Sequence, residues 1–331
     1  MAGAVLVGMV AASPAAAPTL PRALLLEHVN LNTPDRDVAR AFYADALGGR
    51  VNPTSTNDRQ LHINAGVSQL HLPTVRSVLG REPVTVAQRW GGTLEFLTAE
   101  PLAAVAERVC AAGYAARAVA PRHEGAGAAL DVDGPWASAI TLRAAPAGLA
   151  SAIAALRGHA GGSGPLLALS RATMHVPPGK ACAIGRFYEQ ILGLAVEEEA
   201  GRVAVRFESG RSGLPAQLLA FEEAADAPAA DAYDVDEAAA VHIALYVRDE
   251  AAFVAAFERA EAAGIVYINP RFEGGPPEFA SARTLGEAVA YGQFRVKDCC
   301  DPATGRLGVV LEHEVRSPSH RAFPLGVAGS A

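Results

Sequence analysis

The chain has 331 residues, half of them apolar, and a formal net charge of -7 at pH 7. This length is comfortable for two domains, each able to bury most of its apolar surface. Proteins bind nucleic acids and anionic membranes through clustered Lys and Arg, so a net negative charge argues against both as partners. We therefore expect a small-molecule substrate.

The first 22 residues are rich in Ala and Pro and hold an apolar run from Ala4 to Ala12. That run is far too short to span a bilayer, and no Lys or Arg precedes it as in a signal peptide. Residues 1–22 are interpreted as a flexible or truncated leader, with a targeting segment as the alternative. Unless the leader is a targeting segment, we expect a cytoplasmic protein.

The first predicted module begins with strand character over 23–32. The polar TPDRD that follows supplies a helix N-cap, and apolar residues at helical spacing predict a helix over 38–47. Three short strands are then expected between Asn, Asp and Gly turn signals, over 49–52, 60–64 and 67–72. Together these elements make one βαβββ module.

The pattern then restarts. A second module is expected with its strands near 92–97, 115–120, 128–132 and 137–142 and its helix over 101–112. Residues 146–167, which include GHAGGSGP, are interpreted as a linker with a short helix near 149–156. A third module has its helix over 182–192, and a fourth has its helix over 251–263 and LGVVLEHEV as last strand.

Two helix signatures occur twice in the same order. FYADALGG at 42–49 reappears as FYEQILGL at 187–194, and AERVCAAG at 106–113 reappears as FERAEAAG at 257–264. The molecule is therefore predicted to be a duplicated unit. Four cysteines in so long a chain make no disulfide framework and are expected to be buried reduced thiols: Cys110, Cys182, Cys299 and Cys300.

A first-strand His, then FYxxxLG, then a second module whose helix ends in AAG resembles the vicinal oxygen chelate superfamily, which includes glyoxalase I, the bleomycin and fosfomycin resistance proteins and the type I extradiol dioxygenases. The resemblance covers nearly all of 24–317. It implies an α+β fold of four βαβββ modules, paired into two half-open eight-stranded barrels. It also implies an N-terminal pair at 23–145 with a degenerate site, a C-terminal pair at 168–318 with a metal in its cup, and a tail at 319–331.

In such families the metal ligands lie on the first and last strands of the paired modules. Carried onto the C-terminal pair, these positions are His175, His242 and Glu312, the last four residues after Gly308. Two imidazoles and one carboxylate favour Fe(II) or Mn(II), with Zn(II) and Ni(II) as alternatives. Glu314 lies two residues further along the strand and faces the same side as Glu312. It is expected to replace Glu312 as ligand if the strand register differs by two residues, and otherwise to act as a catalytic group beside the metal. His313, between them, should point to the opposite side of the strand.

The remaining cup position of the C-terminal pair is Gln217. Glyoxalase I places a carboxylate there that takes a proton, which an amide cannot do, so Gln217 argues against standard glyoxalase chemistry unless Glu314 substitutes. In the N-terminal pair the equivalent positions are His28, Gln69, a residue near Gly91 or Gly92, and Ser138. One ligand among four does not bind a metal tightly, and His62 and His71 are left as spare imidazoles.

Extradiol dioxygenases carry a histidine and then a tyrosine before the turn that precedes the glutamate. Here that turn is Asp301 and Pro302, and the two places are held by Tyr291 and Asp298, which are therefore candidate catalytic residues. Other polar residues either line the cup or are ordinary half-buried positions: Tyr188, Tyr246 and Arg206. Three polar residues follow the last strand and are interpreted as part of an exposed tail, with closure of the barrel mouth as the alternative: Arg316, Ser317 and His320.

Three functions stay open. The first is a divalent-metal enzyme acting on a small oxygenated, potentially catecholic substrate, with dioxygenase-like chemistry favoured over lyase or isomerase chemistry. The second is a binding protein that sequesters an aromatic or hydrophobic compound, as the resistance proteins do. The third is a structural or regulatory protein whose histidines belong to the core. The protein could form a homo-oligomer under any of these three functions.

Overall fold

The computed structural model of the chain describes residues 22–76, 80–120, 127–232, 241–272 and 281–326. The predicted leader lies outside these residues except for Arg22. The first module contains β1 (Leu25–Asn30), α1 (Arg36–Arg40), the π-helix η1 (Ala41–Ala46), β2 (Arg50–Val51), β3 (Gln60–Ala65) and β4 (Ser68–Pro73). Asp35 caps α1, because its carboxylate accepts hydrogen bonds from the backbone N–H groups of Asp37 and Val38 at 2.9 and 3.0 Å.

The second module contains β5 (Gly92–Thr98), α2 (Leu102–Ala111), β6 (Ala115–Val119), β7 (Ala129–Asp133), the 3₁₀ turn η2 (Pro135–Ala137) and β8 (Ala139–Ala144). The linker holds α3 (Leu149–Ala154). The third module contains β9 (Leu166–Val176), α4 (Ala181–Gln190), β10 (Val196–Glu199), β11 (Arg202–Phe207) and β12 (Gln217–Glu223). The fourth contains β13 (His242–Tyr246), α5 (Glu250–Ala262), the 3₁₀ turn η3 (Pro270–Phe272), α6 (Leu285–Tyr291), β14 (Gln293–Cys300) and β15 (Leu307–Arg316).

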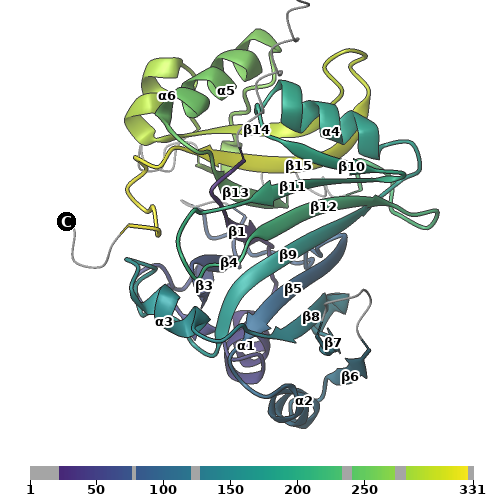
Figure 1. Cartoon of the computed structure of the whole chain (residues 1–331), viewed down its shortest axis with the longest axis vertical. Helices are drawn as coiled ribbons and strands as arrows, with labels where there is room; N and C mark the ends of the chain where they lie inside the picture. Colours follow the sequence, from purple (N-terminus) through teal and green to yellow (C-terminus); the bar gives the residue numbers. More distant parts are fainter. Residues whose placement is uncertain (1–21, 77–79, 121–126, 233–240, 273–280, 327–331) are drawn as a thin grey trace, which may run out of the picture.

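The strands form two mixed sheets, which we name after their central first strands. The β1 sheet has the order β14-β15-β13-β1-β4-β3-β2, and the β9 sheet has the order β10-β11-β12-β9-β5-β8-β7-β6. Figure 1 shows the β9 sheet crossing the front of the molecule, with α4, α5 and α6 at one end and α1 and α2 at the other. The predicted α+β fold of paired βαβββ modules in two half-open sheets is confirmed. Eight strands were predicted for each half-open barrel, and among the described residues the β9 sheet has eight and the β1 sheet has seven.

The pairing of the modules differs from the prediction. The first strand of module one pairs antiparallel with that of module four (β1 with β13), and the first strand of module two pairs antiparallel with that of module three (β5 with β9). The predicted cups at 23–145 and 168–318 were therefore wrong. Each cup is built from one module of each copy, because strand pairing is decided by contacts between distant segments and not by order along the chain.

The repeated helix signatures explain how adjacent modules still hold together. Arg108 of α2 donates from Nε to the carbonyl of Ala46 at 2.9 Å, and Arg259 of α5 donates from Nε to the carbonyl of Ile191 at 2.8 Å. Both acceptors lie near the C-terminal end of the FYxxxLG helix of the preceding module, where backbone carbonyls lack helical partners. The duplication thus conserves a helix-to-helix contact within each copy, while the sheets join the two copies.

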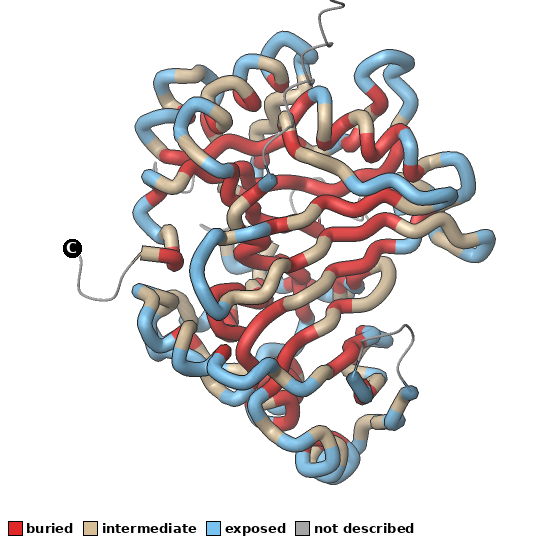
Figure 2. Tube along the Cα trace, viewed as in Figure 1, coloured by how far each residue is buried: buried red, intermediate tan, exposed pale blue. Residues whose placement is uncertain are grey.

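Among the described residues, one large apolar core and two smaller clusters fill the space between the sheets and helices, and Figure 2 shows that the central strands are buried along most of their length. The C-terminal residues 317–326 also pack onto the molecule: His320 is buried and its Nδ1 is 3.1 Å from the Tyr246 hydroxyl, and Leu325 is buried. The prediction of an exposed tail was therefore wrong for Ser317, His320 and Leu325, whereas Ser319, Arg321 and Ala322 are exposed. Among the described helices, none is long and apolar enough to cross a membrane.

Candidate metal centre

One side of the β1 sheet carries a cluster of histidines and carboxylates, which we call the β1 cup. It is defined by His28 on β1, His71 on β4, His242 on β13 and Glu314 on β15. The register is symmetric: His71 lies opposite the residue two positions after His28, and Glu314 lies opposite the residue two positions after His242. The two halves of the cup thus offer equivalent positions, filled by different side chains.

Three of these side chains are placed to share a cation. The ligand atoms of His28, His242 and Glu314 all lie within 4.8 Å of one another, and all three residues are buried. Glu314 Oε2 is 3.9 Å from His28 Nε2, and Glu314 Oε1 is 3.6 Å from His242 Nε2. His28 Nε2 has no hydrogen-bond partner in the part of the chain that the structure describes.

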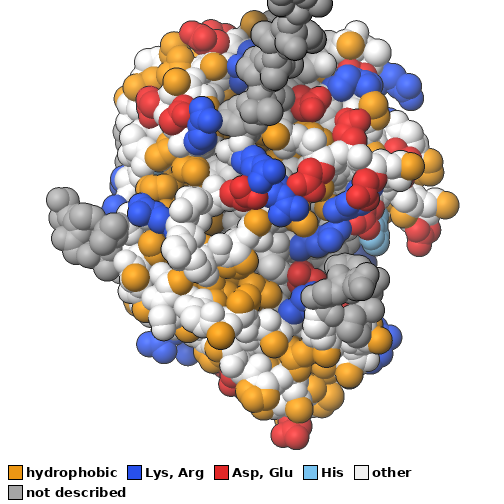
Figure 3. Space-filling view, in the orientation of Figure 1, with side chains coloured by type: hydrophobic (Ala, Val, Ile, Leu, Met, Phe, Trp, Pro, Cys, Tyr) orange, Lys and Arg blue, Asp and Glu red, His pale blue; other side chains and the backbone are white. Residues whose placement is uncertain are grey.

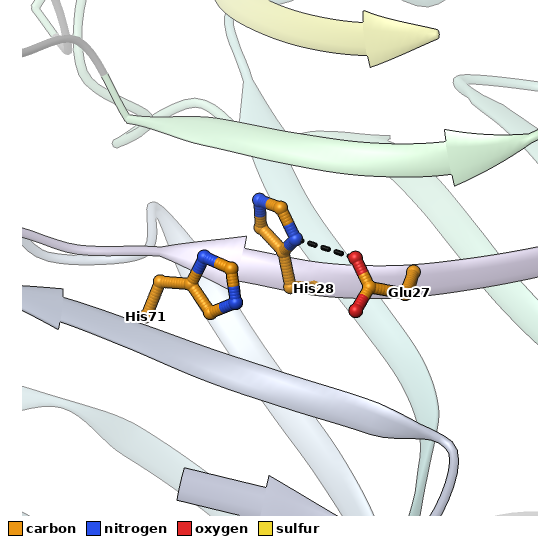
Figure 4. Close-up of side chains that lie close together, drawn as sticks. All are labelled: Glu27, His28 and His71. Atoms are coloured by element: carbon orange, nitrogen blue, oxygen red, sulfur yellow. Dashed lines mark hydrogen bonds and ion pairs between the residues drawn. The ribbon is translucent and has the colours of Figure 1, made fainter. Parts of the chain in front are cut away.

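The other nitrogen of His28 is fixed by its neighbour. A register shift in β1 between Leu26 and His28 lets Glu27 face the cup as well, and Glu27 Oε2 is 2.6 Å from His28 Nδ1 (Figure 4). Because Glu27 accepts from Nδ1–H, Nε2 is the ring nitrogen that points away from Glu27, as in the carboxylate–histidine–metal arrangement of metalloproteins. Burial opposes ionisation of Glu27, but His28 and Arg316 lower its pKa to about 2.

Two arginines neutralise the carboxylates of the cup. Arg295 binds both Glu312 and Glu314, and Arg316 binds Glu314 at 2.5 Å and Glu27 at 2.7 Å. Although burial opposes ionisation, Arg295 and Arg316 hold the pKa of Glu314 well below its ordinary value. Burial also holds the pKa of His242 well below its usual range, so this imidazole is neutral at neutral pH and offers a lone pair.

A third imidazole, His71, belongs to a hydrogen-bonded relay. The Asn64 amide nitrogen donates to two backbone carbonyls of the linker, so its oxygen must accept from the Gln69 amide nitrogen, at 2.6 Å. The Gln69 oxygen is then the acceptor for His71 Nε2–H, at 3.0 Å, which leaves His71 Nδ1 as an acceptor. The His71 ring stacks between His28 and His62, with centroids at 3.7 and 3.8 Å.

The cup opens into a cavity of about 520 Å³. His71, His242 and Glu314 line it, and its other lining residues are polar except for Pro73 and Phe272. A volume of this size suits a small organic ligand.

The structure separates the predicted metal ligands. His242 lines the β1 cavity and Glu312 lies opposite it on β15, but His175 lines a cavity of the β9 sheet, so the predicted set of His175, His242 and Glu312 is not brought together. Glu312 is also engaged elsewhere, because it accepts hydrogen bonds from Arg295 and from Asn269 Nδ2 at 2.8 Å. Burial raises the pKa of Glu312 despite the adjacent Arg295. Glu314, two residues on, is the carboxylate of the cluster.

The other predicted site residues lie outside the β1 cup. Gln217 is buried between the two sheets, where its amide bonds the backbone of Leu26. Tyr291, at the end of α6, packs half-buried against the core, and Asp298 is exposed on β14; neither is among the described residues that line the cavity. His313 faces the core as predicted, with its Nε2 2.7 Å from the Tyr188 hydroxyl.

Sequence reasoning missed the partners that complete the site. The sequence places His28 at a ligand position but as the one imidazole among four such positions, and it predicts no role for His71. Once β1 pairs with β13, both join His242 and Glu314 in one cup. The run LLLEHVN, with two adjacent polar residues inside an apolar strand, was the available signal for Glu27 and His28.

The β9 cup, on the equivalent side of the β9 sheet, has a different character. It contains a cavity of about 570 Å³ lined by His175 and by ion-paired charges. Arg143 pairs with Glu95 at 2.6 Å, and Arg171 pairs with Glu222 at 2.8 Å. Figure 3 shows side chains of both charges intermixed across the middle of this face. Among the described residues, no group of three metal-ligating side chains gathers there.

No family model matches the sequence, and no curated protein matches it. Solved structures match in fold. A Bacillus subtilis protein described as a "putative dioxygenase" is 15% identical, with a TM-score of 0.53 over 90% of this chain and 87% of that chain. Glyoxalase I from Zea mays is 11% identical, with a TM-score of 0.50 over 89% of this chain and 92% of that chain. The paired βαβββ modules and these structures together show that the chain has the fold of the vicinal oxygen chelate superfamily.

Proposed function

We propose that this chain is a divalent-metal-dependent enzyme that binds one ion through His28, His242 and Glu314 and acts on a small oxygenated substrate in the β1 cup. The observation that carries the proposal is His28 Nε2, which is buried without a hydrogen-bond partner in the described part of the chain, while Glu27 occupies Nδ1. A buried polar atom without a partner is unfavourable, and a cation held with His242 and Glu314 would satisfy it.

The donor set fits such an ion. Two imidazoles and one carboxylate are ligands of Fe(II), Mn(II) and related divalent ions, and they leave coordination positions open for substrate. A bound ion would supply Lewis-acid activation of paired substrate oxygens. Glu314 can serve although Arg295 and Arg316 bind it, because an ionised carboxylate offers about four lone-pair sites.

The remaining groups of the cup would bind and orient the substrate. His71 carries its proton on Nε2 and so presents Nδ1 as an acceptor for a substrate hydroxyl. His71 also holds the position equivalent to Glu314, so one of the two last strands supplies an imidazole in place of a carboxylate. The donor set of two imidazoles and one carboxylate supports dioxygenase-like chemistry, whereas glyoxalase-like proton transfer would require Glu314, the one carboxylate of the set, to act as the base.

A second candidate is a binding protein that uses the same cavity without metal. It is favoured by Arg295 and Arg316, which already compensate the charge of Glu314. The two candidates differ in whether the cup requires an ion.

The test is metal content after anaerobic purification and reconstitution with Fe(II) or Mn(II). We expect about one ion per chain in the wild type, with loss in His28→Ala, His242→Ala and Glu314→Gln at an unchanged circular dichroism spectrum. His175→Ala is the matched control, since it removes a strand histidine from the β9 cup and should keep the ion. Loss of metal in His175→Ala but not in His28→Ala would contradict the site, and a wild type without metal would favour the binding protein.

A further inference from the structure

A row of alternating charges crosses the β9 cup. Six consecutive strands of the β9 sheet, from β8 through β5, β9, β12 and β11 to β10, each contribute one side chain to it (Figure 1). Arginine and glutamate alternate along the whole row, so its three positive and three negative formal charges balance. We call these six residues the charge row: Arg143, Glu95, Arg171, Glu222, Arg202 and Glu199.

The members of the charge row are joined from end to end. Glu95 lies directly opposite Arg171 on the neighbouring strand, and Arg202 Nε is 3.3 Å from Glu222. Three ion pairs complete the row: Arg143 with Glu95 at 2.6 Å, Arg171 with Glu222 at 2.8 Å, and Arg202 with Glu199 at 3.0 Å.

The stability of the fold does not explain the charge row. The side chains of Arg143 and Glu95 are only 15% and 19% exposed, and that of Arg171 is 25% exposed. Exposed ion pairs contribute little to the free energy of unfolding, and partly buried pairs lose hydration that apolar residues at the same positions would not lose. A row of this kind is better explained by a ligand that contacts it.

The rest of the cup offers hydroxyl groups and one imidazole. Thr93 and Thr173 lie directly opposite each other on β5 and β9, and Thr141 and His175 line the same cavity of about 570 Å³. The Thr173 hydroxyl oxygen accepts from Arg171 Nε at 3.0 Å, so its own hydrogen is left to be donated. Every described residue that lines this cavity has a polar side chain, and the volume suits a small molecule.

We propose that the β9 cup binds a neutral polyhydroxylated compound, a carbohydrate of one or two sugar rings. A sugar hydroxyl is both donor and acceptor, so neighbouring hydroxyls can donate to a glutamate of the charge row and accept from the adjacent arginine. The ion pairs need not break, because a guanidinium has five N–H donors and a carboxylate about four lone-pair sites. A charged ligand would lose its hydration and meet as many like charges as opposite ones.

The test is saturation-transfer difference NMR on the full-length chain. Glucose, maltose and trehalose are the neutral ligands, and citrate, spermidine and glycine betaine serve as an anion, a cation and a zwitterion. We expect a signal from at least one sugar, with or without added divalent metal, because this cup is separate from the metal cluster of the β1 cup. The absence of a signal from all three sugars would overturn the proposal.

Matched variants locate the bound sugar. Arg171→Gln should weaken its binding by about tenfold, and Thr173→Val, which keeps the shape and the charges, by about fivefold. Arg117→Gln is the control, because Arg117 forms a cross-strand ion pair with Asp133 in the same sheet but does not line the cavity. Circular dichroism establishes that each variant is folded, and Thr173→Val carries the test if Arg171→Gln is not.

Two results would overturn this assignment even if a sugar binds. Loss of the sugar signal in His242→Ala with retention in Thr173→Val would place the sugar in the β1 cup. A signal from citrate, spermidine or glycine betaine that Thr173→Val and Arg171→Gln remove would mean that the β9 cup recognises charge and not hydroxyl groups. The proposed metal enzyme is tested separately, since metal content in these two variants should equal that of the wild type.

Discussion

The side-chain amide of Gln217 hydrogen-bonds both backbone groups of Leu26: its Oε1 accepts from the Leu26 N–H at 2.9 Å, and its Nε2 donates to the Leu26 carbonyl at 3.0 Å. The same nitrogen lies 2.8 Å from the carbonyl of Leu169 on β9. Gln217 begins β12 and therefore ties the β9 sheet to β1, directly before the residues that form the metal cluster. Its role is to join the two sheets, which explains why an amide stands at a position where the family resemblance implied a ligand.

Gln217→Glu should destabilise the fold without changing metal content. A carboxylate keeps the bond from the Leu26 N–H but cannot donate to the two carbonyls, and its buried charge would face them without a cationic partner, so we expect the free energy of unfolding to fall by about 3 kcal/mol. Urea denaturation followed by circular dichroism measures this change. Gln190→Glu, at an exposed position of α4, is the control and should leave the midpoint nearly unchanged. A loss of bound metal at full stability would instead return Gln217 to the metal site.

The elements of the fold were predictable because their signals are local. The helix expected at 101–112 is found as α2, Leu102–Ala111, and the strand expected at 92–97 is found as β5, Gly92–Thr98. The helix α6 was missed, although Thr284 and Glu287 form a capping box, which is a recognisable start signal in a sequence.

The site was only half predictable because it depends on which modules pair. His242, Glu312 and Glu314 were found from their positions on first and last strands. Choosing His175 instead of His28 followed from pairing neighbouring modules, and no residue pattern in one sequence tells whether β13 will meet β1 or β9. The bonds that decide this, such as Gln217 to Leu26, join residues far apart in the chain.

Gly66 should not tolerate a side chain. It forms an isolated bridge to Ala168 of the neighbouring sheet, has φ of +65°, and a Cβ there would lie 1.6 Å from the carbonyl oxygen of Leu167. Since backbone cannot yield as a flexible side chain does, Gly66→Ala should lower the free energy of unfolding by about 3 kcal/mol or more. Thermal unfolding or the yield of soluble protein would report this loss.

Gly113→Ala separates the two causes of that loss. Gly113 also has a positive φ, +86°, but no atom lies within 4 Å of a Cβ placed there. Gly113→Ala should therefore lower the free energy of unfolding only through the strain of an alanine at positive φ, by about 1 kcal/mol. If both variants unfold at the same denaturant concentration, the close approach of the sheets at Gly66 is not what makes the glycine necessary.

Glu27→Gln should weaken metal binding although Glu27 is not a ligand. The carboxylate orients His28 through Nδ1 at 2.6 Å and makes its other nitrogen a better donor to a cation. Loss of such a partner reduces metal affinity by about 10- to 100-fold in metalloproteins. Competition with a chelator of known affinity measures the change, and Glu258→Gln, exposed on α5, is the control. Unaltered affinity in a folded Glu27→Gln protein would remove Glu27 from the site.

Asp301 should make stability depend on pH below about 4. Arg186 donates two hydrogen bonds to its carboxylate, at 3.1 and 2.6 Å, and holds the pKa of Asp301 well below its ordinary value. The unfolded chain, with an ordinary aspartate pKa near 4, then takes up the proton first, so this stabilisation is present above about pH 4 and is lost as the pH falls. Asp301→Asn should lower the urea midpoint at pH 7, and the gap from wild type should narrow at pH 2.5, whereas exposed Asp45→Asn should show no gap at pH 7. A gap that stays constant between the two pH values would mean that the turn requires the shape of the Asp301 side chain and not its charge.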